Sequence, residues 1–518
     1  MKNTSRTAAV ALVSLLSVPA VAQIPVPPGA PVAQAAPAAP GPAAAPAPEA
    51  PPAPMPPPTP EAPPPPPVVS MPAPPVAEPV LLPGGEPLAG FSDGTAFLRS
   101  PENAFILFPN GRLQIDGYAF KTANPKPNNT FLLRRARLEL AGWVENLVYF
   151  SLAGDFAAGP PAGAAPVGPT NLITTDDFVA IAPWGNLVIL QVGQYDAPFT
   201  LENRTSDKYF DFMERSITVR AFGIPDNKEQ GAMLHGFNDA RNFHYSIGYF
   251  NGDGQNFKNA DTNFDLMMRG WVAPFSFLGD GPLRDATIGG SFWTGNRSNT
   301  LALANQTTQG GFTFLSFSQF NLMNAATMTT TPYQFRQVGR MYGAAGELNV
   351  PVAHKFGARY EFVWKHNPLS ADSIAANGSG TIQGGADLRG YSMYGELWYW
   401  VLGDDRIIGD QQGLEPFARY KRFGVKAPQR GLMLATRVEY LSEKLELDPD
   451  TAALMLPSSA IGQTKVTSWE LGVNYWISKR FRATANYVLN HFGGDTTFIK
   501  GLKSNNEQEL AFRLAIAL

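Results

Sequence analysis

The sequence contains no cysteine, little charge and no long apolar run beyond its first residues. None of the 518 residues is cysteine and 16% are charged, where about a quarter is usual for a globular protein. The stability of the chain therefore does not depend on disulfides. After residue 22, no window reaches the roughly 18 uninterrupted apolar residues of a membrane helix, so any membrane-spanning region of the mature chain must consist of strands.

Residues 1–22 have the pattern of a secretory signal peptide. Lys2 and Arg6 precede an apolar stretch, which ends in "AVA" before Gln23, as at a cleavage site. The alternative is a retained anchor, but serine and proline interrupt the apolar stretch, which is short for a bilayer span. We expect an exported protein and exclude these residues from the fold.

Residues 23–90 are predicted to form a disordered Pro/Ala-rich tail in the periplasm. They contain 27 of the chain's 48 prolines, in runs such as "APMPPPTPEAPPPPP", and no lysine or arginine. Such a segment cannot bury a core and favours extended polyproline II. It is either a spacer or a segment that contacts the cell wall polymer, and its chemistry does not choose between them.

Residues 91–518 alternate polar and apolar side chains with a period of two. In residues 135–144 the odd positions carry Arg, Arg, Glu, Ala and Trp, and the even positions Ala, Leu, Leu, Gly and Val. The same alternation recurs in residues 359–364, 432–440, 468–475 and 481–487. This period predicts β-strands with one apolar face.

An all-β transmembrane antiparallel β-barrel explains this pattern better than a soluble β-sandwich. A sandwich rarely exceeds about 250 residues as one domain, whereas a membrane barrel turns its apolar face to lipid and its polar face to a wet lumen. The predicted strands have about 9–12 residues, as a bilayer requires. The last segment, "ELAFRLAIAL", resembles the C-terminal strand by which outer-membrane barrels are recognised by their assembly machinery.

The predicted connections alternate between short and long. Short ones lie at 145–146, 183–186, 238–242 and 351–355, and long ones at 157–173, 196–230, 295–340 and 366–390. This is typical of periplasmic turns and outer loops. The candidate strands come to an odd number, whereas a single-chain bacterial barrel needs an even one. The strand count is therefore wrong by one somewhere between about residues 391 and 466, and the barrel has either 16 or 18 strands.

The chain resembles the phosphate-selective outer-membrane porins of the O/P type. The resemblance rests on the order of several segments: "FLLRRARLELAG", "SLAGDFA", "VGQYDAPFTLEN", "TSDKYFDFMERS", "YFNGDGQN", "ELWYWVLGDDR" and "ELGVNYWISKRFRATANYVL". It implies a trimeric porin of the bacterial outer membrane and favours 16 strands. It also implies that wall arginines and lysines near a constriction guide phosphate inward.

The connection 196–230 is the candidate constriction loop. It is the third long outer loop, often the constricting one in porins, and the family resemblance of "TSDKYFDFMERS" supports this interpretation over a solvated surface loop. The candidate constriction residues are Arg204, Lys208, Asp211, Glu214 and Arg215.

Strand parity assigns a set of arginines to the lumen. The predicted pore-lining residues are Arg135, Arg137, Arg359, Arg419, Arg437, Arg482 and Arg513. Arg134 is expected at the membrane edge of its strand, where a long side chain can snorkel. The same parity sends a similar number of acids inward, among them Glu139, Glu361 and Glu439. Each of these three acids lies two residues from an arginine on the same strand. Such a pair either only neutralises its own charges or takes part in selecting ions, and the sequence leaves both possibilities open. The predicted preference for phosphate therefore rests on the family resemblance alone.

Other functions have weaker support in the sequence. The five histidines form no hydrolase constellation, so we predict a channel and not an enzyme. No metal, cofactor or nucleic-acid motif appears, and we predict none. The rival function is structural, with the barrel tethering the outer membrane to the cell wall through the tail.

Overall fold

In the computed structural model, the described residues lie within Val76–Leu518. The described residues are 88–92, 95–121, 127–157, 172–224, 227–238, 240–278, 281–303, 305–315, 317, 320–324, 328, 330–374, 380–408, 428–456, 461–494 and 505–517. The predicted signal peptide and almost all of the predicted tail lie outside these residues.

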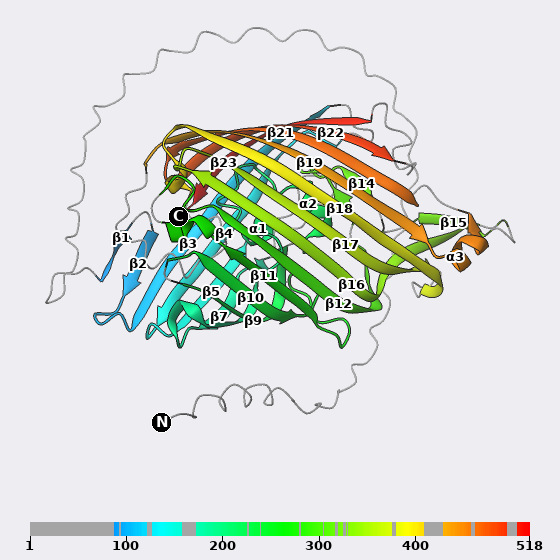
Figure 1. Cartoon of the computed structure of the whole chain (residues 1–518), viewed down its shortest axis with the longest axis horizontal. Coiled ribbons are helices and arrows are strands. Elements are labelled where there is room, and N and C mark those ends of the chain that lie inside the picture. Colours follow the sequence, from blue (N-terminus) through cyan, green and yellow to red (C-terminus); the bar gives the residue numbers. More distant parts are fainter. Residues whose placement is uncertain are drawn as a thin grey trace, which may run out of the picture. The chain divides into compact units, whose positions relative to one another are not determined.

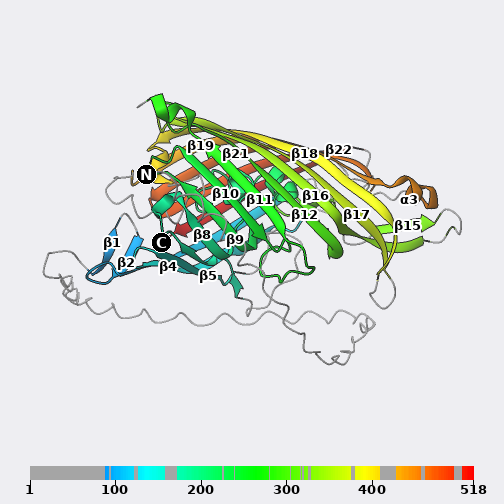
Figure 2. The ribbon, with the colours of Figure 1, turned by 60° about the horizontal axis from the view of Figure 1, so that its bottom comes forward.

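The described strands form a closed antiparallel barrel (Figures 1 and 2). Its 16 strands, in order around the ring, are β3 (Phe105–Lys121), β4 (Thr130–Val144), β5 (Val148–Asp155), β7 (Asp177–Ile181), β8 (Ile189–Asp196), β9 (Lys228–Phe237), β10 (Phe243–Phe250), β11 (Asp265–Val272), β12 (Thr287–Ala302), β16 (Thr330–Val352), β17 (Phe356–Ile374), β18 (Gly380–Leu402), β19 (Gly431–Leu447), β21 (Gly462–Ser478), β22 (Phe481–Gly494) and β23 (Asn506–Ala517). The ring closes where β23 pairs with β3. The predicted barrel is confirmed, and the alternative of 18 strands is wrong.

The excess candidate strand is explained by the pairing of β18 with β19. These strands pair directly from Ala386–Leu447 to Leu402–Leu432, so no strand separates them. Arg419, predicted to face the lumen from this part of the chain, lies in 409–427, outside the described residues.

Shorter strands and helices lie outside the ring of 16 strands in the barrel's topology. The strands outside the ring are β1 (Ala89–Ser92), β2 (Thr95–Arg99), β6 (Ile173–Thr174), β13 (Gln306–Thr307), β14 (Thr313–Leu315), β15 (Phe320–Asn324) and β20 (Met455–Leu456). The helices are α1 (Leu201–Arg204), α2 (Ile217–Phe222), α3 (Pro449–Leu454) and the 3-10 turns η1 (Gly185–Leu187), η3 (Pro274–Leu278) and η4 (Asp405–Ile407). None of the described helices has the length and apolar character to cross a membrane.

The apolar face of each strand lies on the outside of the barrel. In β21, Ser468 and Glu470 are almost fully buried, while the intervening Trp469 and the following Leu471 are exposed. Exposed apolar side chains on an outer surface suit contact with lipid, and the polar face is left for the lumen. The period-two pattern of the sequence therefore translates directly into the two faces of the wall.

Two predicted outer loops are shorter than expected because the strands are longer. The sequence predicts loops at 295–340 and 366–390, but β12 continues to Ala302, β16 begins at Thr330, and only 375–379 separate β17 from β18. The additional strand residues do not form a long apolar face. The alternation of polar and apolar residues, from which strands are predicted, therefore does not extend into them. They run toward the end of the barrel that carries α3 and β15, opposite β1 and β2 (Figures 1 and 2).

Candidate functional site

The connection between β8 and β9 lies inside the ring of strands and carries α1 and α2 (Figure 1). Both short helices are capped by side chains, since the Thr200 hydroxyl accepts from the Asn203 N–H and the Ser216 hydroxyl from the Val219 N–H. Such caps satisfy amide groups at a helix start that lack an intrahelical partner. We call this connection, residues 197–227, the inner loop.

Wall carboxylates bind the first amides of both helices. Glu361 of β17 accepts from the backbone N–H groups of Leu201 and Glu202, at 2.5 and 3.1 Å. Glu439 of β19 accepts from the N–H of Ile217 at 2.5 Å. A carboxylate is favoured at this end of a helix by its exposed amides and its dipole, so these acids hold the inner loop against one side of the barrel.

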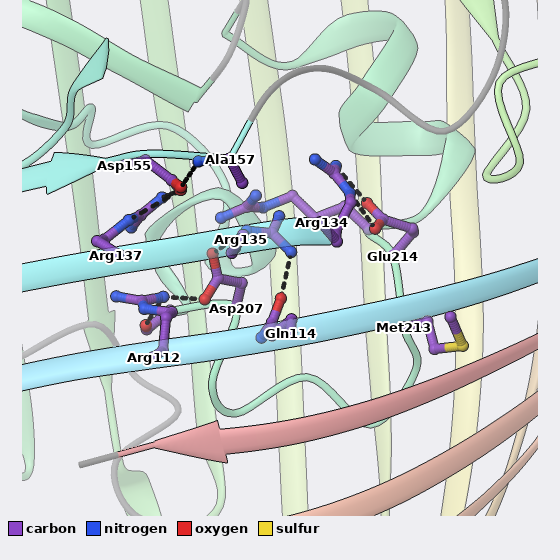
Figure 3. Close-up of polar contacts among 12 residues, drawn as sticks. Arg112, Gln114, Arg134, Arg135, Arg137, Asp155, Ala157, Asp207, Met213 and Glu214 are labelled. Atoms are coloured by element: carbon purple, nitrogen blue, oxygen red, sulfur yellow. Dashed lines mark hydrogen bonds and ion pairs between the residues drawn. The ribbon is translucent and has the colours of Figure 1, made fainter. Parts of the chain in front are cut away.

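Elsewhere on the wall, inner-loop carboxylates bind arginines of β4 and β23. Glu214 contacts Arg134 through two hydrogen bonds of 2.9 and 3.1 Å, and Arg513 at 2.9 Å. Arg220, also of the inner loop, lies 3.7 Å from the same carboxylate. Figure 3 shows Arg134 and Glu214 facing each other above β4. The single carboxylate of Glu214 therefore forms ion pairs with three arginines.

A second inner-loop carboxylate, Asp207, joins β3 and β4. It pairs with Arg112 and, at 2.7 Å, with Arg135, which also donates to Gln114 at 2.7 Å (Figure 3). Arg137 lies further along β4, 3.3 Å from Asp155. The predicted lumen residues Arg135 and Arg137 are thus buried inside the barrel and paired.

The expected position of Arg134 is wrong, because β4 contains a β-bulge. Gln114 of β3 faces Arg135, but the next residue, Ile115, faces Leu133, so Arg134 is the extra residue. A bulge interrupts the alternation of side chains, and Arg134 points to the same inner side as Arg135. It binds Glu214 and does not snorkel at the membrane edge.

Arg437 is the centre of the contacts on the acidic side. It is almost fully buried and binds Glu202 at 3.0 Å, Glu470 at 2.6 Å and Glu439 at 3.1 Å. Its guanidinium also lies over the ring of Phe212, 4.5 Å from the centroid. One arginine thereby compensates carboxylates from two strands and the inner loop.

The other predicted site residues contact the inner loop in different ways. Arg359 binds Asp211 at 3.0 Å and Glu396 at 2.9 Å. Arg482 donates to the Phe210 carbonyl oxygen at 2.8 Å, and Arg215 to the Glu202 carbonyl oxygen at 3.2 Å. Arg204 donates to the Asp196 carbonyl oxygen, and Lys208 lies 3.9 Å from Glu139.

Arg137, Arg359 and Arg437 each have an acid two residues further along the same strand. Arg437 contacts Glu439, as the spacing allows. Arg137 pairs with Asp155 and Arg359 with Glu396, each directly opposite on the neighbouring strand, and Arg359 also binds Asp211 of the inner loop. Ion pairs between adjacent strands and to the inner loop therefore involve arginines for which the spacing predicts a pair along one strand.

The wall charges are unevenly distributed around the ring. The basic arc, β22, β23, β3 and β4, carries Arg112, Arg134, Arg135, Arg137, Arg482 and Arg513. The acidic arc, β16 to β21, carries Glu347, Glu361, Glu396, Glu439, Glu443 and Glu470. Each arc also holds charges of the other sign, such as Asp116, Glu507 and Glu509 in the basic arc and Arg359 and Arg437 in the acidic arc, and the two arcs meet where β21 pairs with β22. The sign that predominates therefore changes along the wall, which creates a field in the lumen that orients charged solutes.

The acids of the inner loop are more deeply buried than its arginines. Glu202, Asp207, Asp211 and Glu214 are 3–6% exposed, whereas Arg204, Arg215 and Arg220 are half-buried. Burial would raise the pKa of Glu214, but Arg134, Arg513 and Arg135 outweigh it and hold the pKa of this carboxyl well below its usual range. The loop therefore presents mainly positive charge to solvent.

A second connection also enters the barrel, which the sequence did not reveal. Between β12 and β16, Gln306 donates to Glu443 at 2.9 Å and Gln309 to Glu439 at 2.8 Å. Thr307 accepts from Arg220 of the inner loop at 2.7 Å, so the two connections touch. We call residues 303–317 the second inner segment. The sequence does contain one indication of this segment, which is the close spacing of the phenylalanines at 312, 314 and 317. Such large apolar side chains are unusual in an exposed loop, and in the structure all three are buried.

A comparison with protein families agrees with this architecture. The profile described as "Phosphate-selective porin O and P" matches residues 109–506. The chain belongs to this porin family. It is therefore an outer-membrane channel for the diffusion of small solutes, and the family and the barrel indicate a channel rather than an enzyme.

The solved structures similar to this porin include an outer-membrane protein, an outer-membrane channel and a porin. OmpT of Vibrio cholerae lacking loop L8 has 11% identity and a TM-score of 0.47, covering 80% of this chain and 100% of that one. The channel DcaP of Acinetobacter baumannii has 10% identity and a TM-score of 0.44, covering 81% and 99%. An anion-selective porin from Comamonas acidovorans has 11% identity and a TM-score of 0.40, covering 80% and 100%. A comparison of this porin with curated proteins gave no match.

Proposed function

We propose that this porin conducts anions in preference to cations, phosphate among them. The observation that carries the proposal is the unequal burial of the inner-loop charges. The acids of the inner loop are buried in contacts with the wall, whereas its arginines are partly exposed to water. At the basic arc, the side chains of Arg134 and Arg220 are 17% and 20% exposed, against 5% for the Glu214 they share. A passing anion would meet these two guanidinium groups before the carboxylate.

The division of charge supports the same preference. Inner-loop amides already bind Glu361 and Glu439 of the acidic arc, so the charge of these two carboxylates is partly compensated and repels a passing anion less. In a narrow, partly desolvated passage, fixed charges act more strongly than in bulk water. Lumen arginines that are fully paired, such as Arg437, then position the loop, and the half-exposed ones select the ion.

Reversal potential in a planar bilayer under a potassium chloride gradient tests this proposal. We expect the wild type to prefer chloride and inorganic phosphate to reduce the chloride current. Arg134→Gln and Arg220→Gln should each shift the reversal potential toward cations, since each removes one partly exposed positive charge. Arg389→Gln is the control, because Arg389 is 56% exposed and pairs with Glu446 of the wall, not with an inner-loop carboxylate. Cation preference of the wild type would overturn the proposal.

We also propose, from the sequence and the family resemblance, that the mature porin is a homotrimer inserted by the barrel assembly machinery, with residues 23–90 in the periplasm. The tail precedes β1 and β2, which extend the sheet at β3 and contribute no residue to the inner-loop contacts described above. Deletion of 23–87 should therefore leave single-channel conductance unchanged. A large change in conductance would show that the tail takes part in permeation.

A further inference from the structure

Buried oxygen atoms without a hydrogen-bond donor gather where the second inner segment meets the wall. These are Gln306 Oε1, Gln309 Oε1, Glu443 Oε1, Asn486 Oδ1, Asn490 Oδ1, Glu507 Oε1 and Glu509 Oε2. All are acceptors, and a buried acceptor without a donor or cation costs free energy. Each of these oxygens is therefore able to accept a hydrogen bond from water or to coordinate a cation.

Strand register brings two of these side chains, Asn490 and Glu507, into line with Glu439 and Ser468 of the neighbouring strands. Glu439, Ser468, Asn490 and Glu507 face one another in sequence on the four adjacent strands β19, β21, β22 and β23. Asn490 donates its amide group to Glu507 at 2.8 Å. Gln309 donates to Glu439 at 2.8 Å and to Ser468 at 3.4 Å. In both side-chain amides the nitrogen donates to a residue of the wall, and the amide oxygen has no hydrogen-bond partner among the described residues.

Two carboxylates at this position have no basic partner. Glu507 and Glu509 share the inner face of β23 and are 0% and 2% exposed. Among the described residues, no lysine, arginine or histidine lies within ion-pair distance of either one. The second inner segment comes close to them, because a Cβ on Gly310 would overlap the Glu509 carboxylate. Two buried carboxylates this near each other need protons or a cation.

We propose that Glu507, Glu509, Asn490 and Gln309 bind a hard divalent cation of the calcium class. Calcium takes about six to eight oxygen ligands, including carboxylates, amide carbonyls and water, and all four unpaired atoms are oxygens. No three His, Cys, Asp or Glu side chains converge among the described residues, so two carboxylates, two amides and water make up the ligands. The two negative charges match a doubly charged ion.

The cation would fasten the second inner segment to the wall. Gln309 belongs to that segment, whereas the other three ligands belong to β22 and β23, so the ion bridges the two parts. The sequence shows no metal motif because these ligands lie far apart along the chain and only the barrel register unites them. The site does not depend on which solute the porin conducts.

Calcium titration of the refolded, detergent-solubilised porin, free of lipopolysaccharide and treated with a chelator, tests the proposal. Isothermal titration at pH 7.5 should show one calcium per chain, and calcium should raise the thermal unfolding midpoint. The double variant E507Q/E509Q should lose this binding. Gln309→Leu, which removes a single ligand, should weaken it by roughly tenfold or more, as loss even of a supporting group often does.

A matched control and a competing outcome make the test decisive. Glu446→Gln, an exposed carboxylate paired with Arg389 and Lys444, should bind calcium as the wild type does. If the wild type binds no more calcium than E507Q/E509Q, or if calcium leaves its unfolding midpoint unchanged, the carboxyls are satisfied by protons and the proposal fails. Should the double variant not fold, comparison of the wild type with Gln309→Leu gives the same decision.

Discussion

Replacement of Glu214 by glutamine is expected to destabilise the porin by about 3–5 kcal/mol, the usual cost of removing one member of a buried ion pair. Glu214 is the shared partner of Arg134, Arg513 and Arg220. Its loss leaves these positive charges close together with only Asp116 still bound to Arg513. Urea unfolding in lipid vesicles, followed by tryptophan fluorescence, measures the change.

The same variant should also alter conduction. Removing the carboxylate increases the net positive charge of the basic arc, so the reversal potential should shift toward anions. Freed from its anchor, the inner loop should occupy less fixed positions, and current noise should rise. Glu446→Gln is the control, and as a solvent-screened surface pair it should change stability by less than about 1 kcal/mol. A wild-type unfolding midpoint for Glu214→Gln would contradict the anchoring role of this residue.

Replacement of Arg437 by methionine is expected to destabilise the porin by a similar amount. Arg437 compensates Glu202, Glu439 and Glu470 at once, and an uncompensated buried charge costs about 3–5 kcal/mol. The reversal potential should move toward cations, opposite to Glu214→Gln. Vesicle unfolding and bilayer recording measure the two quantities.

Two further variants separate charge from geometry at Arg437. Arg437→Lys keeps the charge but loses the planar fork of donors that reaches several carboxylates, so it should lie between the wild type and methionine. Arg389→Met removes an exposed arginine from β18 and should change little. Equal behaviour of Arg437→Met and Arg389→Met would contradict a central role for Arg437.

The barrel itself was predictable because the alternation of side chains is a local property. Each strand needs one apolar face for lipid, and residues as far apart as 135–144 and 481–487 show it independently. The strand count failed between β18 and β19, because their connection, residues 403–430, contains a stretch around Arg419 whose local sequence pattern resembles a strand. The long extensions of β16 to β18 escaped prediction because they continue without an apolar outer face.

The candidate site was predictable in its parts and not in its contacts. Sequence pointed to the connection 196–230 and to arginines such as Arg135 and Arg513. It could not show that Glu214 joins Arg134 to Arg513, because these residues are distant in the chain and meet only when the ring closes. The bulge at Arg134 was also hidden, since one extra residue in a strand depends on the register of its neighbour.

Hydrophobic periodicity is set residue by residue, so the order of the amino acids is enough to predict an outer-membrane barrel with a polar interior and a charged connection able to enter it. The basic and acidic arcs, the loop charges that stay open to water and the segment that covers Glu507 and Glu509 follow only from the folded chain. Electrostatic pairing depends on the distances between neighbouring strands and between the wall and the segments inside it, and only the closed ring of strands sets these distances.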